Sequence, residues 1–361
     1  MLKPLLPSFL KINNIELVSH NPMQFDVCFG LSNFDGNSYQ LNDYELYLVS
    51  LADGQKDCTE IIKDTVKEFE VNEESVLKTL NYLEKEQVLV DASVRPECIP
   101  DKSNRYSRHM LFFESLGLNG KGVQQKLNKS KVAIIGSGGI GTWLSYNLSA
   151  AGISELTLID ADIVEESNLT RQVLYTMEDI GNYKVESCAK RIKERSPSTI
   201  INTVTKNITS IEDMKEYINN VDLIVLAGDS PANINHLVNE YSFKNNVPWT
   251  RAGYHYYTAV CGPMYIPGQT ACFECATEVT PMSLKNDLPF VSEVNKRYQV
   301  PSFAPVNGIA ATIQAKEVIS YLGEISEWHQ TKEKMFVCDL KLLNMDLIDI
   351  STKKRCELCS N

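Results

Sequence analysis

Apolar and polar positions follow two alternating patterns over residues 132–244. Short apolar runs typical of buried strands are each followed by a stretch with the spacing of an amphipathic helix. The expected strands are 132–135, 156–159, 200–204 and 223–227, and the expected helices are 142–151, 184–195, 211–218 and 233–244. This alternation predicts an α/β fold with a doubly wound, mostly parallel sheet, which binds ligands at the carboxyl ends of its strands.

The first hundred residues show a different order of elements. Short strand-like runs at 9–12, 15–18 and 25–29 are separated by turn-rich pieces such as Asn13-Asn14 and residues 33–37. Two helical patterns follow at 58–69 and 73–86, then a short strand at 88–90 and a linker near 95–101. Strands, then helices, then a small wing predict a winged-helix-like domain over residues 1–100.

Charge narrows the role of this domain. A DNA-binding winged helix needs a basic recognition helix, but residues 73–86 carry four glutamates against two lysines. The order of elements also resembles the peptide-clamp domains with which enzymes of ribosomal-peptide modification hold a precursor by pairing it with a strand edge. A clamp for a precursor peptide and a merely structural module remain the two alternatives.

Composition describes an ordinary globular chain of 361 residues, 43% hydrophobic and 22% charged, with net charge −11. The acidic balance argues against a general nucleic-acid surface, because phosphate backbones require a basic face. No apolar run approaches the roughly 20 residues of a membrane span, and the N-terminus lacks a signal-peptide pattern. We therefore expect a cytoplasmic protein with no nucleic-acid or membrane partner.

A glycine-rich turn connects the strand at 132–135 to the next helix. Its glycines are Gly136, Gly138, Gly139 and Gly141, and Asp160 ends the following strand about 20 residues later. Such a turn is typical of a Rossmann-like nucleotide site, where the helix N-terminus binds phosphates and the acidic residue binds a ribose. On these residues alone, an NAD-dependent oxidoreductase is a possible function.

Other polar residues favour a triphosphate. Arg171, within Asn168-Leu-Thr-Arg-Gln172, and Lys184 are cations near the phosphate turn, where an enzyme displacing pyrophosphate needs them. Asp229 ends an apolar strand and is suited to hold Mg²⁺. The alternatives are solvated cations and, for Asp229, a helix N-cap. Arg108, in Arg105-Tyr-Ser-Arg108, is suited to a phosphate contact or to a linker salt bridge.

Cysteine spacing indicates a metal. Cys272, Cys275, Cys356 and Cys359 form two CxxC pairs, which can close a tetrahedral, structural Zn²⁺ site. A redox pair is the alternative. The polar stretch 276–302 contains no cysteine, and we expect no covalent transfer to a protein thiol. We expect this stretch to close over the substrate.

Together, these motifs resemble the E1-like (ubiquitin-activating, ThiF-type) adenylating family over about residues 103–361. The resemblance rests on Arg105–Arg108, Gly136–Gly141, residues 158–162, Asn168–Gln172, Lys184, Asp229, both CxxC pairs and residues 304–311. Within the family, the stand-alone members of pantocin A and microcin C7 biosynthesis are the most similar. The resemblance implies an adenylation domain at 101–361, with a crossover loop at about 276–302 and a C-terminal zinc-binding tail.

The resemblance also implies roles for the residues. Asp229 would bind Mg²⁺, Arg108 would reach the ATP site of the partner in a homodimer, and Arg171 and Lys184 would stabilise the charge of the reacting phosphates. The expected ATP contacts are Gly136, Gly138, Gly139, Gly141, Asp160, Asp162, Asn168, Arg171, Gln172 and Lys184.

The implied reaction is ATP-dependent adenylation of a carboxylate in a ribosomally made precursor peptide. Pyrophosphate would be released, and the activated peptide would then be modified. Pantocin-like activation of Glu side chains followed by cyclisation is the leading interpretation. Microcin-like attachment of AMP to a C-terminal Asn through a P–N bond is the alternative. Activation of a sulfur carrier is a further alternative.

Overall fold

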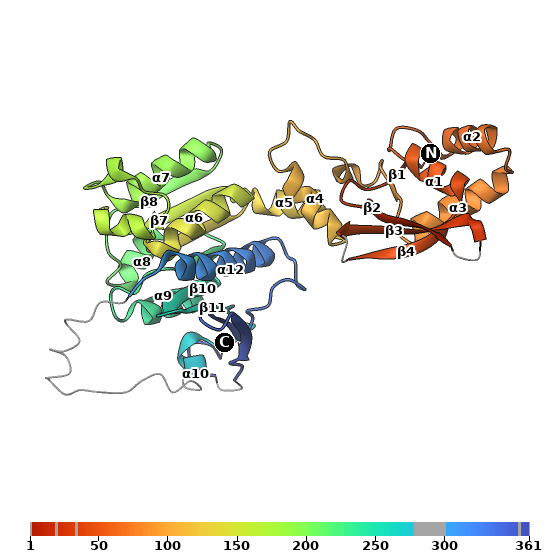
Figure 1. The fold of residues 1–361 in the computed structure, drawn as a ribbon. Coiled ribbons are helices and arrows are strands. Elements are labelled where there is room, and N and C mark those ends of the chain that lie inside the picture. Colours follow the sequence, from red (N-terminus) through yellow and green to blue (C-terminus); the bar gives the residue numbers. More distant parts are fainter. Residues whose placement is uncertain (1, 19–20, 33–34, 278–300, 353–354, 361) are drawn as a thin grey trace. The chain divides into compact units, whose positions relative to one another are not determined.

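The computed structural model describes the chain except for residues 1, 19–20, 33–34, 278–300, 353–354 and 361. The described residues form two compact units, 1–124 and 125–361 (Figure 1). Each unit contains its own sheet and buried core. Most of the expected crossover loop lies outside the described residues. Among the helices that the structure describes, none has the length and apolar character of a membrane span.

The first unit combines helices with a three-stranded antiparallel sheet of order β2-β3-β4. Its core joins Val27 and Leu41 of the sheet to Leu48, Ile61 and Leu80 of three helices. Its elements are β1 (Pro4–Leu5), β2 (Lys11–Val18), β3 (Asn21–Ser32), β4 (Asp35–Leu41), α1 (Asp43–Leu51), α2 (Cys58–Phe69), α3 (Glu73–Lys85), β5 (Val90–Asp91), η1 (Pro96–Cys98) and α4 (Ser107–Ser115), while α5 (Gly120–Leu127) crosses the unit boundary.

Parts of this unit differ from the sequence-based expectation. Asn13-Asn14, expected to form a turn, lies inside β2, and the strand accommodates it by a shift of register between Ile12 and Asn14. Helix α1 was not expected. It begins at a capping box in which Asn42 Oδ1 accepts from the N–H of Glu45 (3.1 Å) and Glu45 Oε2 accepts from the N–H of Asn42 (2.9 Å).

The second unit is built on an eight-stranded sheet of order β13-β12-β11-β10-β9-β6-β7-β8. Strands β10, β9, β6, β7 and β8 pair in parallel, and β11, β12 and β13 extend the sheet by antiparallel pairing. Its strands are β6 (Lys131–Ile135), β7 (Glu155–Ile159), β8 (Ile200–Val204), β9 (Leu223–Leu226), β10 (Trp249–His255), β11 (Thr258–Tyr265), β12 (Lys334–Asp339) and β13 (Asn344–Asp349). The expected α/β fold with a mostly parallel, Rossmann-like sheet is confirmed.

Helices cover both faces of this sheet. Helix α6 packs beside α7 and α12, and α8 packs beside α9 (Figure 1). The α9 face has an aromatic core in which Trp249, fully buried, stacks on Tyr265 with ring centroids 4.6 Å apart. The helices are α6 (Gly139–Ala151), η2 (Glu166–Thr170), η3 (Met177–Asp179), α7 (Lys184–Arg195), α8 (Ile211–Tyr217), α9 (Ile234–Asn245), α10 (Phe273–Thr277) and α12 (Ala304–Leu322).

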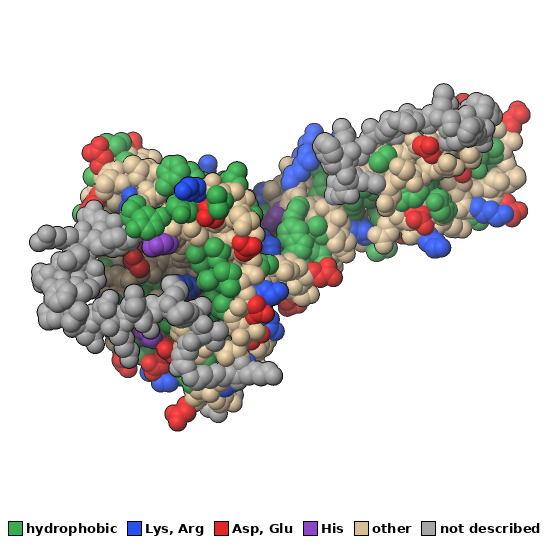
Figure 2. Space-filling model, turned by 60° about the horizontal axis from the view of Figure 1, so that its bottom comes forward, with side chains coloured by type: hydrophobic (Ala, Val, Ile, Leu, Met, Phe, Trp, Pro, Cys, Tyr) green, Lys and Arg blue, Asp and Glu red, His purple; other side chains and the backbone are tan. Residues whose placement is uncertain are grey.

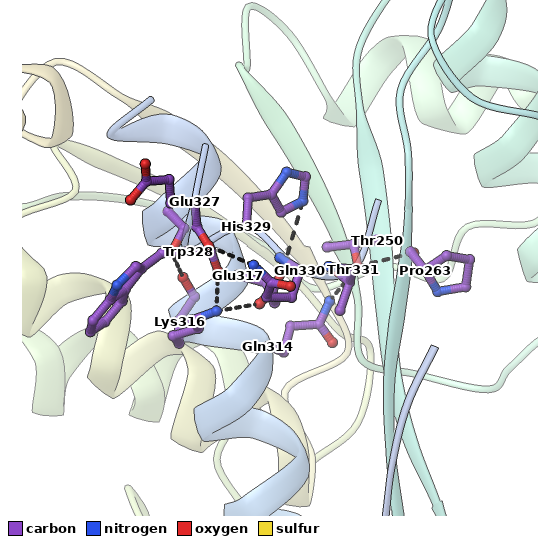
Figure 3. Close-up of polar contacts among 11 residues, drawn as sticks. Thr250, Pro263, Gln314, Lys316, Glu317, Glu327, Trp328, His329, Gln330 and Thr331 are labelled. Atoms are coloured by element: carbon purple, nitrogen blue, oxygen red, sulfur yellow. Dashed lines mark hydrogen bonds and ion pairs between the residues drawn. The ribbon is translucent and has the colours of Figure 1, made fainter. Parts of the chain in front are cut away.

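A buried carboxylate fixes α12 to the segment that leads into β12 (Figure 3). Glu317 Oε2 accepts hydrogen bonds from the N–H groups of Gln330 and Thr331 and from Thr331 Oγ1, each at 2.8 Å. Its Oε1 accepts from Lys316 Nζ at 2.7 Å. Because a buried charge is tolerated only when it is paired and hydrogen-bonded, this set of partners makes Glu317 an anchor for the surrounding chain.

Candidate functional site

The glycine turn follows β6 as expected, and its glycines serve different purposes. Gly136 has φ +97°, and a Cβ there would lie 2.7 Å from the backbone N of Gly228. A Cβ at Gly141 would lie 2.0 Å from the carbonyl oxygen of Gly136. Among the described residues, a Cβ at Gly138 would meet no atom closer than 4.0 Å, where Gln172 Nε2 lies. The packing of the chain itself therefore requires glycine at positions 136 and 141. Gly138 instead borders open space at the start of α6, where phosphates bind in such turns.

Asp160 is fixed against this turn by backbone donors. Its Oδ2 accepts from the N–H of Ser137 at 2.6 Å, and its Oδ1 accepts from the N–H of Asp162 at 2.9 Å. Loss of solvation raises the pKa of Asp160, and the two backbone hydrogen bonds partly offset that effect. Each carboxylate oxygen keeps a lone pair, so this side chain can still accept a hydrogen bond from a ligand hydroxyl.

The segment 168–172 lies beside the same turn. Arg171 donates from NH1 to the carbonyl of Ser167 (3.0 Å), and its Cγ lies 3.5 Å from where a Cβ of Gly139 would be. Asn168 and Gln172 are buried, and Gln172 Oε1 has no hydrogen-bond partner among the described residues. An unpaired buried amide oxygen is costly, so a polar ligand group at this position would be stabilised.

Lys184, the first residue of α7, points toward the end of β7. Its Nζ lies 2.7 Å from Asp162 Oδ2, and its backbone N–H donates to the Asp162 carbonyl at 2.9 Å. The lysine side chain is 9% exposed and the aspartate side chain 69% exposed. The structure therefore brings Asp160, Asp162 and Lys184 together beside the glycine turn, as the sequence analysis expected.

Asp229 follows Gly228, whose backbone contacts the glycine turn. The side chain is exposed, and no hydrogen bond or ion pair joins it to the described residues. Helix α9 begins at Ile234 with Asn233 as its N-cap residue, so Asp229 does not cap this helix and that alternative is wrong. An exposed, unpaired carboxylate beside a phosphate turn fits a Mg²⁺ ligand, because Mg²⁺ prefers carboxylate oxygens and keeps much of its water.

Arg108 lies on α4 of the first unit. Its side chain is exposed and makes no ion pair with residues that the structure describes, which disfavours the linker salt bridge. Its expected role across a dimer interface stays a prediction.

The four cysteines of the two CxxC pairs converge. The Sγ atoms all lie within 4.8 Å of one another, with 3.5 Å between Cys272 and Cys356 and 3.8 Å between Cys275 and Cys359. Four ligands of a tetrahedral Zn²⁺ with Zn–S bonds of about 2.3 Å would be separated by roughly 3.8 Å. The cluster is therefore compatible with zinc.

Asn307 of α12 is a site residue to which the sequence analysis gave no role. It is fully buried, and a Cβ at Gly139 would lie 2.6 Å from its Nδ2. Nδ2 donates to Ser302 Oγ (3.0 Å), while Oδ1 has no partner in the described structure. Its place beside the start of α6 depends on α12 packing against α6, a contact between distant segments that no local pattern reveals.

Comparisons with known proteins agree with this arrangement. The profile of the ThiF family matches residues 106–360. The structure of Escherichia coli MccB with AMPCPP and MccA is 27% identical, with coverage of 99% of each chain and a TM-score of 0.78. The structure of PaaA, 22% identical over 94% of this chain and 98% of its own, has a TM-score of 0.70 and shares the fold.

Curated relatives match shorter parts of the chain. The E. coli ThiS adenylyltransferase is 30% identical over 222 residues, which are 61% of this chain and 82% of that relative. The Scheffersomyces stipitis adenylyltransferase and sulfurtransferase UBA4 is 36% identical over 142 residues, and the match covers only 31% of its length. With the family profile matched over residues 106–360, and with the glycine turn, Asp229 and the four cysteines in place, the chain belongs to the ThiF family.

Proposed function

We propose that the protein uses ATP to adenylate a carboxylate of a ribosomally made precursor peptide and releases pyrophosphate. The observation that carries the proposal is the open space over Gly138 at the start of α6, bordered by segment 168–172 and close to the Asp162–Lys184 pair and Gly228-Asp229. MccB, similar over 99% of both chains, has been solved with ATP and with MccA. Similarity to such complexes supports a peptide substrate.

The proposed step is attack of a peptide carboxylate oxygen on the α-phosphorus of ATP. The new P–O bond forms as the bond to the β-phosphate bridging oxygen breaks, and pyrophosphate leaves with both electrons of that bond. Lys184 and Arg171 stabilise the negative charge on the phosphates, and Asp160 holds the ribose. Mg²⁺ held by Asp229 would supply further charge neutralisation. Catalysis of this kind comes mainly from positioning and electrostatics.

The four-cysteine cluster is assigned a structural role. Four thiolates fill the coordination of a tetrahedral Zn²⁺ and leave no position for a substrate. The cluster joins the start of α10 to residues 356–359, so its metal would hold the end of the second unit in place rather than take part in the reaction.

The first unit is proposed to hold the peptide. Strands β2 and β4 are the outer strands of its three-stranded sheet, so each has an edge on which an extended peptide can pair. We expect that replacing residues on these strand edges of the first unit weakens peptide binding and leaves ATP affinity unchanged.

Pyrophosphate release tests the reaction directly. Two synthetic peptides serve as probes, one ending in Asn and one with an internal Glu-Glu-Asn. We expect release that depends on ATP, Mg²⁺ and one peptide, and loss of release in Asp229→Ala. Asp346→Ala, at another exposed aspartate, is the matched control. Release that survived in Asp229→Ala would contradict the role of Asp229, and no release with either peptide would contradict the substrate assignment.

The product decides between the two fates of the activated peptide. Cyclisation at Glu gives a peptide lighter by one water, whereas AMP attachment gives a peptide heavier by an adenylate group. The sequence analysis favours cyclisation. The similarity to MccB, at higher identity and coverage than to PaaA, supports AMP attachment as the second candidate. Mass spectrometry of the product separates them, and the same assay with a sulfur-carrier protein tests the remaining alternative suggested by the ThiS adenylyltransferase relative.

A homodimer with Arg108 supplied to the partner's site can be tested by mixing. Arg108→Ala and Asp229→Ala would each be inactive alone. In a mixed dimer, one site has both defects and the other has neither, so mixing the two variants restores part of the activity. Failure to restore activity after verified subunit exchange would contradict the role in trans.

A further inference from the structure

Strand β10 continues beyond the end of its parallel neighbour. The β9–β10 pairing stops at Leu226 and Arg251, but β10 runs on to His255 and pairs there only with β11. Past Leu226 the chain turns toward β6: the N–H of Ala227 donates to the carbonyl of Ile135, and Gly228 lies against Gly136. The turn that places Asp229 at the candidate site therefore leaves the β9-side edge of β10 without a strand.

Ladder geometry identifies the free groups on this edge. Tyr256 and Tyr257 form a two-residue hairpin turn, so the pairs His255–Thr258 and Gly253–Val260 bond to β11. Ala252 and Tyr254 alternate with them, so their N–H and C=O groups point to the opposite edge. The parallel pair Arg251–Leu226 is flanked by ladder bonds to residues 250 and 252, so the Ala252 N–H faces the Leu226 carbonyl of β9. The backbone groups that face this edge without a partner among the described strands are the Ala252 C=O and the N–H and C=O of Tyr254.

The edge is both open and rigid. No atom of the described residues lies within 4 Å of the position that a Cβ of Gly253 would take, and glycine inside a strand often marks close approach of another chain. The base of β10 is fixed on its other face, because Gln314 Nε2 donates to Thr250 Oγ1 (3.0 Å), which donates to the Pro263 carbonyl at 3.2 Å (Figure 3). A rigid edge binds an extended chain with less loss of conformational entropy.

A positive charge lies at the base of this edge. Arg251 shares a strand face with Gly253, donates from NH1 to Asn235 Oδ1 at 2.9 Å, and has its guanidinium 5.8 Å from the centre of the Phe273 ring. A peptide that approaches the α-phosphate brings a carboxylate, which such a cation attracts.

We propose that an extended segment of the peptide substrate adds to the sheet at this edge. It hydrogen-bonds to the Ala252 carbonyl and to the N–H and C=O of Tyr254, and its carboxylate thereby arrives beside Asp229. This assignment rests on the proposed adenylation and gives the acyl end of the peptide its own binding site on the second unit. Backbone pairing supplies the affinity, and the open face at Gly253 admits a neighbouring side chain of the peptide.

Proline substitution tests the pairing. Tyr254→Pro removes the outward N–H without removing a bond to β11, because this N–H does not face β11. We expect the KM for the active synthetic peptide to rise about tenfold, the order expected for loss of one hydrogen bond, with KM for ATP unchanged. Tyr254→Ala keeps the N–H and is the matched control, with peptide KM within about twofold of the native value if the backbone carries the contact.

Hydrogen exchange of the native protein gives a test that does not depend on a variant. With a non-hydrolysable ATP analogue present, adding the peptide that supports pyrophosphate release should protect the Tyr254 amide. The Ala252 amide, which already faces the Leu226 carbonyl, should change little. The Gly253 and His255 amides, already bonded to β11, should change little. The edge assignment would be overturned by equal peptide KM values for Tyr254→Pro and Tyr254→Ala, or by equal hydrogen exchange with and without peptide. Pyrophosphate release by the native protein would still support adenylation in either case. Absence of release from the native protein would overturn both.

Discussion

Lys184 and Asp162 form an ion pair whose members are buried very unequally. The Nζ–Oδ2 distance is 2.7 Å, yet the lysine side chain is 9% exposed and the aspartate side chain 69% exposed. The lysine is held in place by the fold, whereas the aspartate can turn into solvent. An incoming phosphate can therefore replace the aspartate as the partner of Lys184 without movement of α7.

Replacing Lys184 separates its catalytic role from its structural one. Lys184→Met should lower pyrophosphate release by at least about 100-fold, the scale typical of losing one preorganised charge from a transition state. Stability should change little, because a methionine fills a similar volume and removes a buried charge. Kinetics and thermal unfolding measured on the same preparation check both statements.

Asp162→Asn is the companion variant. A half-exposed ion pair contributes at most about 1 kcal/mol, so we expect only slight destabilisation. If Lys184 serves the phosphates, release should fall much less than in Lys184→Met. An equal loss in both variants would mean that the pair, rather than the lysine, is required.

Alanine substitutions at two positions of the glycine turn should change different properties, stability at Gly141 and ATP affinity at Gly138. Gly141→Ala would place a Cβ 2.0 Å from the Gly136 carbonyl oxygen, so the protein should lose several kcal/mol of stability, on the order of a severe core mutation. Gly138→Ala would place its Cβ in open space, so the unfolding temperature should stay near the native value while KM for ATP rises. Equal stability of the two variants would contradict this distinction.

The cysteine cluster predicts a metal content and its consequence. We expect about one zinc per chain by elemental analysis, since four thiolates bind one tetrahedral ion. Cys359→Ser should lose the zinc and unfold at a lower temperature. Cys188→Ser, at a buried thiol outside the cluster, is the control that should retain zinc. Chelation should lower stability before it lowers turnover.

Asp179 predicts a pH dependence of stability. Burial alone would raise the pKa of Asp179, but hydrogen bonds from Thr176 and Arg191 outweigh it and hold this pKa below the usual value. A carboxyl whose folded pKa is lowered stabilises the protein above its unfolded pKa, near 3.9, and loses that contribution as pH falls through the folded pKa.

Asp179→Asn should therefore cost about 1–3 kcal/mol at neutral pH, because the partners of a buried charge are left unsatisfied. The difference from the native protein should shrink as pH falls below the unfolded pKa of about 3.9, and it should vanish once pH passes the lower pKa of the folded carboxyl. Denaturant unfolding at a series of pH values measures this. If the native protein and Asp179→Asn differed in unfolding free energy by the same amount at every pH down to acid unfolding, the predicted titration of Asp179 would be contradicted.

Much of the second unit could be predicted from the sequence. Helix α7 and strand β8 have the predicted bounds. The helix follows from a local apolar periodicity that buries Val185, Cys188 and Ile192, whereas the residues of β8, expected to be buried, are exposed or half-buried. The strand, turn and helix around Gly136–Gly141 follow from glycine stereochemistry. The convergence of the four cysteines was predictable from two CxxC pairs, since that chemistry imposes proximity on segments 84 residues apart.

Other features depend on contacts that local patterns do not encode. The antiparallel extension depends on the pairing of β11 with β12, two strands that are far apart in the sequence, and Asn307 reaches the site only because α12 packs beside α6. Helix α1 lacks a clear division between apolar and polar faces, so periodicity did not predict it. Its capping box, Asn42 with Glu45, was the available signal.

The cysteine cluster also sets an order of events during synthesis of the chain. Cys272 and Cys356 are 84 residues apart, and α12, β12 and β13 lie between them. The ribosome therefore completes the whole antiparallel end of the sheet before the second pair of thiols emerges. If the cluster holds zinc, the ion can close it only after β13 has been made. Zinc shortage would then leave chains whose glycine turn is already folded but whose residues 356–359 are not held to the start of α10.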